Sequence, residues 1–598
     1  LLLFSAILIL INSVSPSKYS ALIFSLAAGI ILGTPLTDQW MGNPIVRFLK
    51  KFGGYWSDWN GFDDFAPFFL IRLVLGGLLV ISFWIAKDLV RNTKQKMVRG
   101  IVLCGIGLAM GILGNQISKR YKAPNKAAQI AWMADYEKKF RHYQDIPQLT
   151  VLAVNTSIEL FPEKNAYSLR GTYSLKNLSS QPLDRLLLNF HRELSLKGAV
   201  FRFKNQEIAL NQVTSEIFLD EPMSPEEEAS LEFDLSYQLH PSMGFSSDNA
   251  MLKNGTFLRL SRYFPEFGYL SSFELEDSEL RKSFGLGEKT IPKTLEDPKE
   301  NPLDMISLTM RISTSTNQMA FGTGELVRAE KVNDRNFYTY HADSVPFRFA
   351  VSSGSYQQSS IEHKGIPIKV YFHPQHGENV DLLLTHAAYA LDYCIKNFGD
   401  FPFKSISFVE VSSMASGFNA TAYPSVIFIN EGQAFHSKLK DQPEDDVILE
   451  LAAHEIAHFW WGGNRILPDQ REGASFLTES LAMYTEMMIY KHRYGEETMK
   501  EKLDLHRQIY QMKKGYFVPE PLSRVNASFT HLSYSKGALV MVELSEILGE
   551  DRLNGMLKEF LTTYAYPKRP ISLDLINILC QGATALECAK IKELLEVY

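Results

Sequence analysis

The sequence has few cysteines and no excess of positive charge. Its 598 residues include 4 cysteines, and 61 basic side chains against 67 acidic ones give a net charge of −6. This balance excludes a cationic nucleic-acid binder, which needs clustered Lys and Arg to neutralise phosphates. The hydrophobic share of 45% excludes a disordered acidic tail. The cysteines match no zinc ribbon or disulfide framework, so the sequence assigns no role to Cys104, Cys394, Cys580 and Cys588.

Two short signals are also missing. The chain has no GxxxxGK[ST] phosphate-binding motif, so any ATPase that works with it would be a separate chain. It opens at Leu1 without a Met or a basic n-region, which argues against a signal peptide and predicts a start inside a longer polypeptide. The length itself predicts roughly three to five structural units.

Apolar runs are concentrated before residue 118. They lie at Leu1–Ile11, Ser20–Gly33, Pro67–Ala86 and Gly100–Gly114. A hydrocarbon core of about 30 Å needs about 20 apolar residues, which the third run meets best. Buried core helices are the alternative interpretation. Four runs in one block favour a transmembrane region over residues 1–117 with about four helices.

The orientation in the membrane follows from the charges of the loops. The loop at 87–100 has the most basic residues of any loop between two runs, whereas further basic residues follow the fourth run at 119–126. Cytoplasmic loops are enriched in Lys and Arg. The loop at 87–100 therefore indicates that this loop is cytoplasmic and that the C-terminal part lies outside the cytoplasm. The basic residues at 119–126 favour the opposite orientation.

The remaining chain divides by its periodicity. Residues 118–147 have helical spacing and predict a connecting helix. Alternation such as Leu231–Leu239 predicts an antiparallel β domain over 148–365. From 366 the pattern becomes α+β, which places a catalytic domain at 366–545 and the start of a helical C-terminal region at 546–598. The segment at 221–228, with two prolines, is expected to be a solvated loop.

The chemistry-bearing segment is HEIAH at 454–458. His454 and His458 are four residues apart, so on a helix both imidazoles leave the same face and can share one tetrahedral ion, with Glu455 beside it. A structural pair of histidines on a core helix is the alternative. A catalytic zinc uses three protein ligands and keeps one position open for water.

The third ligand is expected on the following helix. Glu479 lies in FLTESLAMYTEMM, whose apolar spacing predicts a buried helical face from which a carboxylate reaches the ion. Glu472 is the competitor, in the loop-like DQREGAS. Glu486 lies two turns after Glu479 and could orient a ligating histidine, or it could be an ordinary helix-surface glutamate.

The segment HEIAHFWWGGN followed by LTES resembles the gluzincin metallopeptidases of the aminopeptidase N and leukotriene hydrolase group. NFGDFPF at 397–403 and YSKGALVMVELSEILGE at 534–550 are similar to further segments of this family, over about residues 148–598. The resemblance implies one zinc ion held by His454, His458 and Glu479, with Glu455 as general base and Tyr534 as transition-state stabiliser. It also implies a saddle-shaped β domain, a thermolysin-like zinc peptidase domain and a helical C-terminal region.

Two positions depart from the family pattern. The spacing between His458 and Glu479 is 20 residues, two more than the family's usual spacing, which a longer loop can absorb at little cost. The family's aminopeptidases carry a strand glutamate that binds the free amine of the substrate, whereas Ala422 stands at about that place here. The nearest carboxylate is that of Glu431, so a requirement for a free amino terminus is in question.

A second resemblance concerns the first 117 residues. Four apolar runs, a loop with YWSDWNGF at 55–62 and a following peptidase resemble bacterial proteins that fuse an ABC-transporter-type permease region to a peptidase domain of this family. The expected protein is a zinc metallopeptidase of the bacterial inner membrane, with the peptidase domain outside the cytoplasm. Its expected partners are a peptide substrate, the lipid bilayer and a separate ABC ATPase subunit, with no nucleic acid. The alternative is a peptide-binding or sensing module of a permease with little or no catalysis.

Overall fold

The structure is a computed structural model that forms two compact units, Leu1–Ala131 with Leu239–Ser246, and Trp132–Gln238 with Ser247–Tyr598. It describes residues 2–33, 56–62, 65–91, 95–120, 126–239, 248–298, 305–415, 417–438, 446–463 and 465–597. Tyr55 and Asn464, which belong to two of the motifs above, lie outside these ranges.

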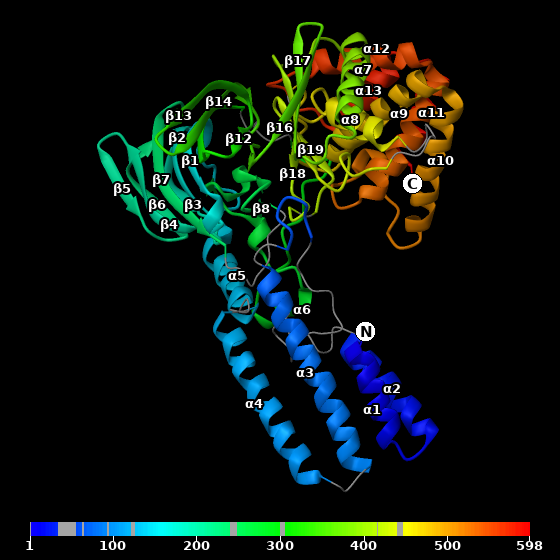
Figure 1. Cartoon of the computed structure of the whole chain (residues 1–598). Coiled ribbons are helices and arrows are strands. Elements are labelled where there is room, and N and C mark those ends of the chain that lie inside the picture. Colours follow the sequence, from blue (N-terminus) through cyan, green and yellow to red (C-terminus); the bar gives the residue numbers. More distant parts are fainter. Residues whose placement is uncertain are drawn as a thin grey trace. The chain divides into compact units, whose positions relative to one another are not determined.

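Among the described residues, four helices lie entirely within the first unit. They are α1 (Leu2–Val14), α2 (Lys18–Gly33), α3 (Phe65–Arg91) and α4 (Lys96–Arg120). In Figure 1, α3 and α4 run side by side, and Phe68, Leu75 and Ile117 form a small buried cluster.

Two of these helices are long and apolar enough to cross a membrane. The segments are Phe65–Leu89, with a mean hydropathy of 2.3, and Lys96–Ile117, with 1.9. The helices α1 and α2 have 13 and 16 residues, fewer than the roughly 20 that a span requires. In the part of the chain that the structure describes there are thus two candidate spans, where the sequence predicts about four.

The β part of the second unit begins with a large sheet. Its eight strands have the order β13-β14-β11-β1-β2-β7-β4-β5. Neighbours are antiparallel except β1 and β11, which pair in parallel, so the expected purely antiparallel domain contains one parallel pair. The bounds are β1 (Thr150–Phe161), β2 (Ala166–Lys176), β4 (Ser195–Phe203), β5 (Gln206–Leu210), β7 (Glu228–Gln238), β11 (Ile306–Ser315), β13 (Glu325–Val332) and β14 (Arg335–Val345).

Two smaller sheets accompany it. The first has the order β10-β3-β6 and the second β12-β15-β9-β8. Their bounds are β3 (Leu183–Asn189), β6 (Thr214–Met223), β10 (Glu266–Phe267), β8 (Asn249–Ala250), β9 (Thr256–Leu258), β12 (Met319–Gly322) and β15 (Val351–Gly354). The segment expected as a loop at 221–228 is partly strand, because β6 continues to Met223 and β7 begins at Glu228.

A five-stranded sheet precedes most of the helices of this unit in the chain. Its order is β16-β17-β18-β20-β19, with parallel pairs inside and antiparallel strands at both edges. The bounds are β16 (Gln357–His363), β17 (Ile366–Phe372), β18 (Ile406–Val411), β19 (Ala420–Tyr423) and β20 (Val426–Asn430). The central strand β20 is buried at every residue and its neighbour β18 at all but one, as parallel strands covered by helices usually are.

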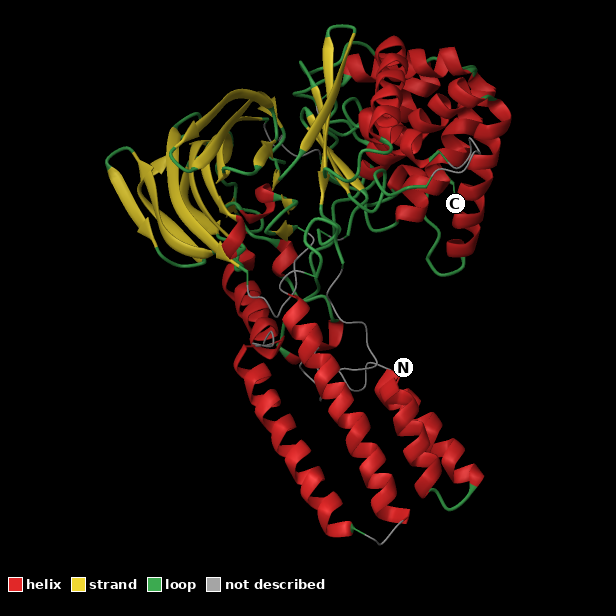
Figure 2. Cartoon of the chain, viewed as in Figure 1, coloured by secondary structure: helices red, strands yellow, loops and turns green. Residues whose placement is uncertain are grey.

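Helices dominate the chain after this sheet, as the red ribbons of Figure 2 show. One apolar core extends from Ile368 to Leu595 and joins the sheet to these helices. The helices are α7 (Val380–Phe398), α8 (Val447–Ala457), α9 (Leu481–Tyr494), α10 (Glu496–Lys514), α11 (Gly537–Leu548), α12 (Glu550–Thr563), α13 (Ser572–Gln581) and α14 (Ala585–Glu596).

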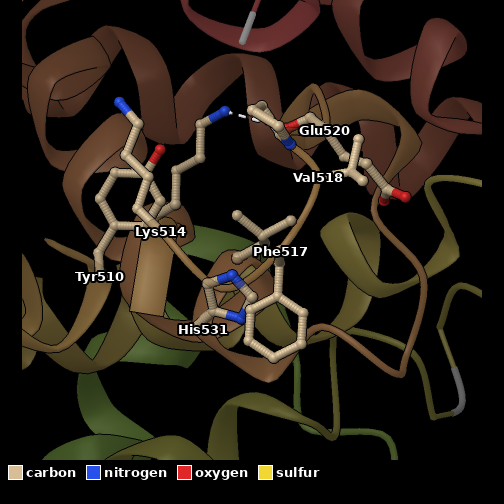
Figure 3. Close-up of a pocket in the computed structure, with 9 residues that line it drawn as sticks. Tyr510, Lys514, Phe517, Val518, Glu520 and His531 are labelled. Carbon is tan, nitrogen blue, oxygen red and sulfur yellow. Dashed lines mark hydrogen bonds between the residues drawn. The ribbon is translucent and has the colours of Figure 1, made fainter. Parts of the chain in front are cut away.

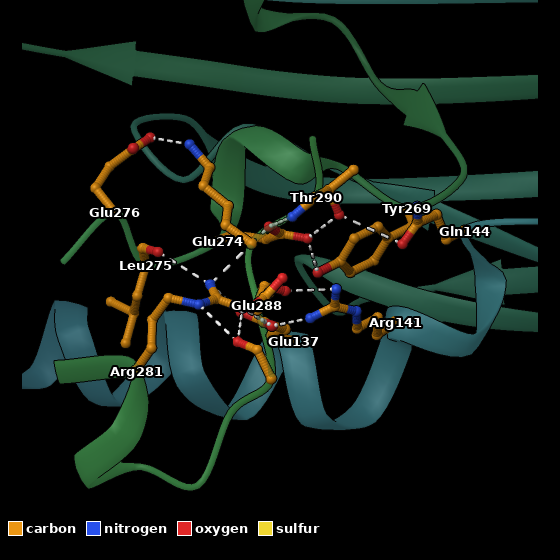
Figure 4. Close-up of polar contacts among 12 residues, drawn as sticks. Glu137, Arg141, Gln144, Tyr269, Glu274, Leu275, Glu276, Arg281, Glu288 and Thr290 are labelled. Atoms are coloured by element: carbon orange, nitrogen blue, oxygen red, sulfur yellow. Dashed lines mark hydrogen bonds and ion pairs between the residues drawn. The ribbon is translucent and has the colours of Figure 1, made fainter. Parts of the chain in front are cut away.

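The helix that precedes the β part, α5 (Lys126–Phe140), contains a buried charge network. Arg281, in the short helix α6 (Ser278–Ser283), donates to both carboxylate oxygens of Glu137 at 2.6 and 3.0 Å, and both side chains are at most 5% exposed. Arg141 donates to the same carboxylate at 2.6 Å (Figure 4). Such a buried pair is costly to break, so it fixes α5 to α6.

Cys580 and Cys588, to which the sequence assigns no role, form a disulfide. The helix α13 ends at Gln581 and α14 begins at Ala585, so the turn between them brings the two Cα atoms to 4.7 Å. Their spacing of 8 residues matched no disulfide framework because the pairing depends on this turn between two helices.

Candidate metal and catalytic site

The helix α8 carries the HEIAH segment and has a firmly built N-terminus. The carboxylate of its N-cap residue, Asp446, accepts from the backbone N–H groups of Ile448 and Leu449 at 3.2 and 3.0 Å. It also binds His386 and Tyr494. Burial opposes ionisation, but these hydrogen bonds outweigh it and lower the pKa of Asp446 to about 2. The charged cap satisfies the first N–H groups of the helix and anchors it to its neighbours.

Three expected ligands converge at the other end of α8. The Nε2 atoms of His454 and His458 are 3.2 Å apart, and each lies 3.5 Å from Oε2 of Glu479. Their possible ligand atoms all lie within 4.8 Å of one another. Two imidazoles and one carboxylate around a common point are a donor set that suits zinc.

The two imidazole rings are oriented by acceptors at their Nδ1 atoms, opposite the Nε2 atoms that would bind a metal. His454 Nδ1 lies 3.3 Å from Oε2 of Glu486, a side chain that is 2% exposed, and His458 Nδ1 lies 3.1 Å from the carbonyl oxygen of Trp461. A proton on each Nδ1 is thereby directed to an acceptor, which leaves both Nε2 lone pairs for a metal. Glu486 therefore faces a candidate ligand instead of lying on the helix surface.

The unsatisfied atoms of this cluster fit a bound cation. Oε2 of Glu479 and Oε2 of Glu455 are buried and have no hydrogen-bond partner among the residues that the structure describes. Buried polar atoms are normally paired, so unpaired carboxylate oxygens beside two free imidazole lone pairs are what an ion or a water at this point would satisfy. The residues present thus fit one zinc ion.

Glu455 and Tyr534 flank the ligands. Glu455 is 7% exposed, and its burial raises the pKa of its carboxyl against the opposing effect of His458 and His454. The ring of Tyr534 stacks on His454, with centroids 5.5 Å apart and an interplanar angle of 18°. Burial, followed by the charge of Glu479, raises the pKa of Tyr534, so its hydroxyl stays protonated at neutral pH.

Two π-helical segments carry Glu479 and Tyr534. They span Phe476–Ser480, before α9, and His531–Lys536, before α11. Ser480 Oγ in the first donates to the carbonyl of Ser533 in the second at 2.6 Å. Single π turns inside helices are frequent at functional sites. Sequence periodicity predicts a continuous helix here, because the extra residue of a π turn leaves no separate local signal.

The aromatic residues after HEIAH pack on the NFGDFPF segment. Trp460 Nε1 donates to the carbonyl of Gly399 at 3.1 Å, and the rings of Phe398 and Trp461 meet edge to face at 5.0 Å. Gly399 has a φ of 97°, which favours glycine where α7 ends. The two motifs thus support each other across the core.

Glu472, the competing ligand, lies elsewhere. Its Oε2 accepts from Arg524 at 2.8 Å, so its charge is already paired. The same loop is fixed by the ion pair between Asp469 and Arg471, whose side chains are at most 1% exposed. The guanidinium of Arg471 also donates to the carbonyl of Pro298 at 2.9 Å. The longer spacing before Glu479 is therefore accommodated by an anchored loop.

The edge strand β19 contains a feature that sequence reasoning missed. Arg348 donates to the carbonyl of Ala422 at 2.8 Å and to Oγ1 of Thr421 at 3.0 Å. Glu431, the carboxylate nearest in sequence, is buried and accepts from Ser413 at 2.6 Å. No local pattern marked Arg348, which lies 74 residues before Ala422 in the chain.

A small pocket adjoins the segment that carries Tyr534. It lies between the end of α10 and the second π segment, and Lys536 donates to the carbonyl of Glu520 beside it at 3.2 Å (Figure 3). None of the three expected zinc ligands lines it. The lining residues are Tyr510, Lys514, Phe517, Val518, Pro519, Glu520, His531, Leu532 and Lys536.

Comparison with known protein families identifies this region. Residues 384–598 match the Peptidase family M1 domain. The chain is 30% identical to aminopeptidase N of Canis lupus familiaris over 144 residues, which are 22% of this chain and 14% of that protein. It is 20% identical to endoplasmic reticulum aminopeptidase 2 of Homo sapiens over 222 residues, 35% of this chain and 22% of that protein. The chain thus spans less than a quarter of the length of these two relatives.

Solved structures share the fold. The M1 zinc metallopeptidase of Deinococcus radiodurans, as a mutant, superimposes with a TM-score of 0.53 at 15% identity, over 75% of this chain and 95% of that one. A two-domain M1 zinc metallopeptidase mutant bound to L-tryptophan gives a TM-score of 0.54 at 14% identity, over 75% and 94%. Residues 384–598 therefore match a peptidase domain of the M1 type, the chain shares the fold of M1 zinc metallopeptidases, and these matches imply a single catalytic zinc.

Proposed function

We propose that this chain is a membrane-anchored zinc peptidase of the aminopeptidase type, with His454, His458 and Glu479 as zinc ligands. The observation that carries the proposal is the convergence of these three side chains, each histidine 3.5 Å from Glu479, beside Glu455 and Tyr534. The chemistry that zinc supplies in such a site is Lewis acidity toward a water molecule and the scissile carbonyl.

The residues of the chain have distinct tasks in this reaction. Glu455 accepts the proton of the attacking water and transfers it to the departing nitrogen, a task that its raised pKa favours. The protonated hydroxyl of Tyr534 donates a hydrogen bond to the oxyanion, which is typically worth about 3 to 4 kcal/mol. Glu486 and the carbonyl of Trp461 hold the imidazoles in the ligating tautomer.

The proposal extends to the membrane. The helices α3 and α4 would anchor the chain, and the peptidase domain would lie outside the cytoplasm of a bacterial cell. The disulfide between Cys580 and Cys588 supports that side, because disulfides persist in oxidising compartments. The first unit would belong to an ABC-type permease that a separate ATPase chain serves, with domain boundaries near residues 117, 147, 365 and 545.

The test uses the full chain in detergent. We expect about one equivalent of zinc and hydrolysis of some members of a peptide panel with free and blocked amino termini. Glu455→Gln should keep the zinc and lose hydrolysis by at least roughly 10²-fold, since general acid–base catalysis supplies that much. Wild-type activity in this variant would refute the mechanism.

A matched pair of variants tests the ligand assignment. Glu479→Gln should lose zinc, whereas Glu472→Gln should keep it, because Glu472 is paired with Arg524. Zinc loss from Glu472→Gln alone would refute the assignment.

The alternative function, a peptide-binding or sensing module of the permease, is favoured by Ala422 and the longer spacing before Glu479. A protein that binds zinc and peptides but hydrolyses no member of the panel would support this alternative.

A further inference from the structure

A cationic cluster lies along the edge strand β19, next to the metal-binding helix. Arg348 is exposed, and its guanidinium lies over the ring of Tyr423 with 4.4 Å to the centroid. Two of its N–H groups bind the strand at Thr421 and Ala422. A guanidinium has five N–H donors, so three remain for a ligand.

A second guanidinium, that of Arg259, lies within electrostatic range of the first. It sits over the ring of Phe418, with 5.1 Å to the centroid, and its buried Nε has no hydrogen-bond partner among the described residues. Asp248 lies 3.5 Å from this Nε but also pairs with Arg262 at 2.5 Å. One carboxylate is thus shared by two guanidiniums, while Arg348 has only neutral partners on the strand.

The charges of this cluster repel one another. Burial lowers the pKa of Arg259, and the charges of Arg262 and Arg348 lower it further, whereas Tyr423 and Asp248 oppose them. The cluster also borders the catalytic residues, because β19 packs against α8 and the charge of Arg348 acts on Glu455. An anion bound here would relieve the repulsion and lie near the reacting atoms.

We infer that Arg348 and Arg259 form a subsite that binds a carboxylate of the substrate beside the metal-binding residues. The inference rests on the proposed function and names its substrate class: peptides with a carboxylate at this position. Arginine suits the role because its planar fork matches a carboxylate with two parallel hydrogen bonds. The strand itself, Ala420–Tyr423, offers no carboxylate to an ammonium group.

The carboxylate can come from an acidic side chain or from the C-terminus of the peptide. Two arms separate these sources in the full chain. The first compares peptides with Glu or Gln at each position and an amidated C-terminus. The second compares free and amidated C-termini in a peptide with Gln. Affinities are measured in the Glu455→Gln background, so that binding is read without hydrolysis, and kcat/KM is measured in the wild type.

We expect the carboxylate form to bind roughly 10- to 100-fold more tightly than its neutral counterpart in one arm, as a hydrogen-bonded charge typically provides. Arg348→Gln should abolish this preference and leave the affinity for the neutral peptide within about twofold. Arg348→Lys should keep part of it. Arg328→Gln removes an exposed arginine of β13 that pairs with Glu330, and should change nothing.

Equal affinity for both forms in both arms, or a preference for the neutral form, would overturn the inference. So would an equal loss for all peptides in Arg348→Gln, which would indicate that Arg348 only supports the strand. A wild type that binds carboxylate peptides selectively but hydrolyses none would contradict the proposed function and leave the subsite intact. The two proposals therefore fail on different readouts.

Discussion

The contact between Gly537 and Ser480 offers a sharp test of how the site is assembled. A Cβ added at Gly537 would lie 2.4 Å from Oγ and 2.7 Å from Cβ of Ser480, and 3.1 Å from its Cα. Rotating the serine does not relieve the last contact, and Oγ is also held by the carbonyl of Ser533. In Gly537→Ala the start of α11 must therefore move away from the π segment of Glu479.

The expected cost is about 1 to 3 kcal/mol, as for other insertions into packed interiors. The gain in helix propensity from alanine offsets about 1 kcal/mol of it. We expect a lower midpoint of thermal unfolding and a larger relative loss of kcat, because the shift separates the segments of Glu479 and Tyr534. Gly555→Ala is the matched control, since Gly555 lies on the exposed side of α12 with nothing within 4 Å and should be stabilised.

A double mutant isolates the contact. Ser480→Gly removes both side-chain atoms that the new methyl would meet, so Gly537→Ala should cost less in that background, with a coupling of about 0.5 to 3 kcal/mol. The assay is denaturant or thermal unfolding of all four proteins, together with peptide hydrolysis. Additive effects, or stabilisation by Gly537→Ala in the wild-type background, would refute the reasoning.

Three further predictions concern stability. The pKa of Asp446 is lowered to about 2, so its contribution to the free energy of unfolding is complete above the unfolded pKa of 3.8 and is lost as the pH falls toward 2. Asp446→Asn should make the stability less dependent on pH in acid unfolding, and an unchanged pH profile would contradict this prediction. Cys580→Ser should cost about 2.5 kcal/mol by chain entropy, and reduction of the wild type should give the same loss; no loss in either case would argue against the disulfide. Glu137→Gln should cost roughly 3 to 5 kcal/mol, because it removes the carboxylate that accepts two hydrogen bonds from buried Arg281 and leaves only the more distant Glu274, at 4.0 Å, among its described anions. A loss below 1 kcal/mol in thermal unfolding would show that Glu274 or water compensates.

Local patterns in the sequence predicted the elements that depend on neighbours along the chain. The strands Ile406–Val411 and Ile366–Phe372 have their expected bounds, and the spacing of HEIAH places both histidines on one helix face. Alternation predicted a strand at 347–356, but β15 begins only at Val351, because pairing with β9 and β12 decides its start.

Features that depend on distant partners could not be predicted. The π segments, the pairing of Cys580 with Cys588 and the contact of Arg348 with β19 all require knowledge of which segments meet. The choice between Glu479 and Glu472 is similar, because it depends on which carboxylate reaches the two histidines and on Arg524 pairing with Glu472. Sequence periodicity reports a buried face but not the partner that covers it.

The π turn before α9 also has a consequence for the helix that follows it. One extra residue in a turn advances every later residue by about 100° around the axis, since an α-helix has 3.6 residues per turn. All ten residues of α9 from Leu481 to Tyr490 are buried, so the surrounding core fixes the rotation of this helix, and the π turn sets the direction of Glu479, just before it, toward the histidines. Removal of one residue from Phe476–Ser480 would therefore either disrupt the packing of α9 in the core or turn the carboxylate of Glu479 away from the histidines.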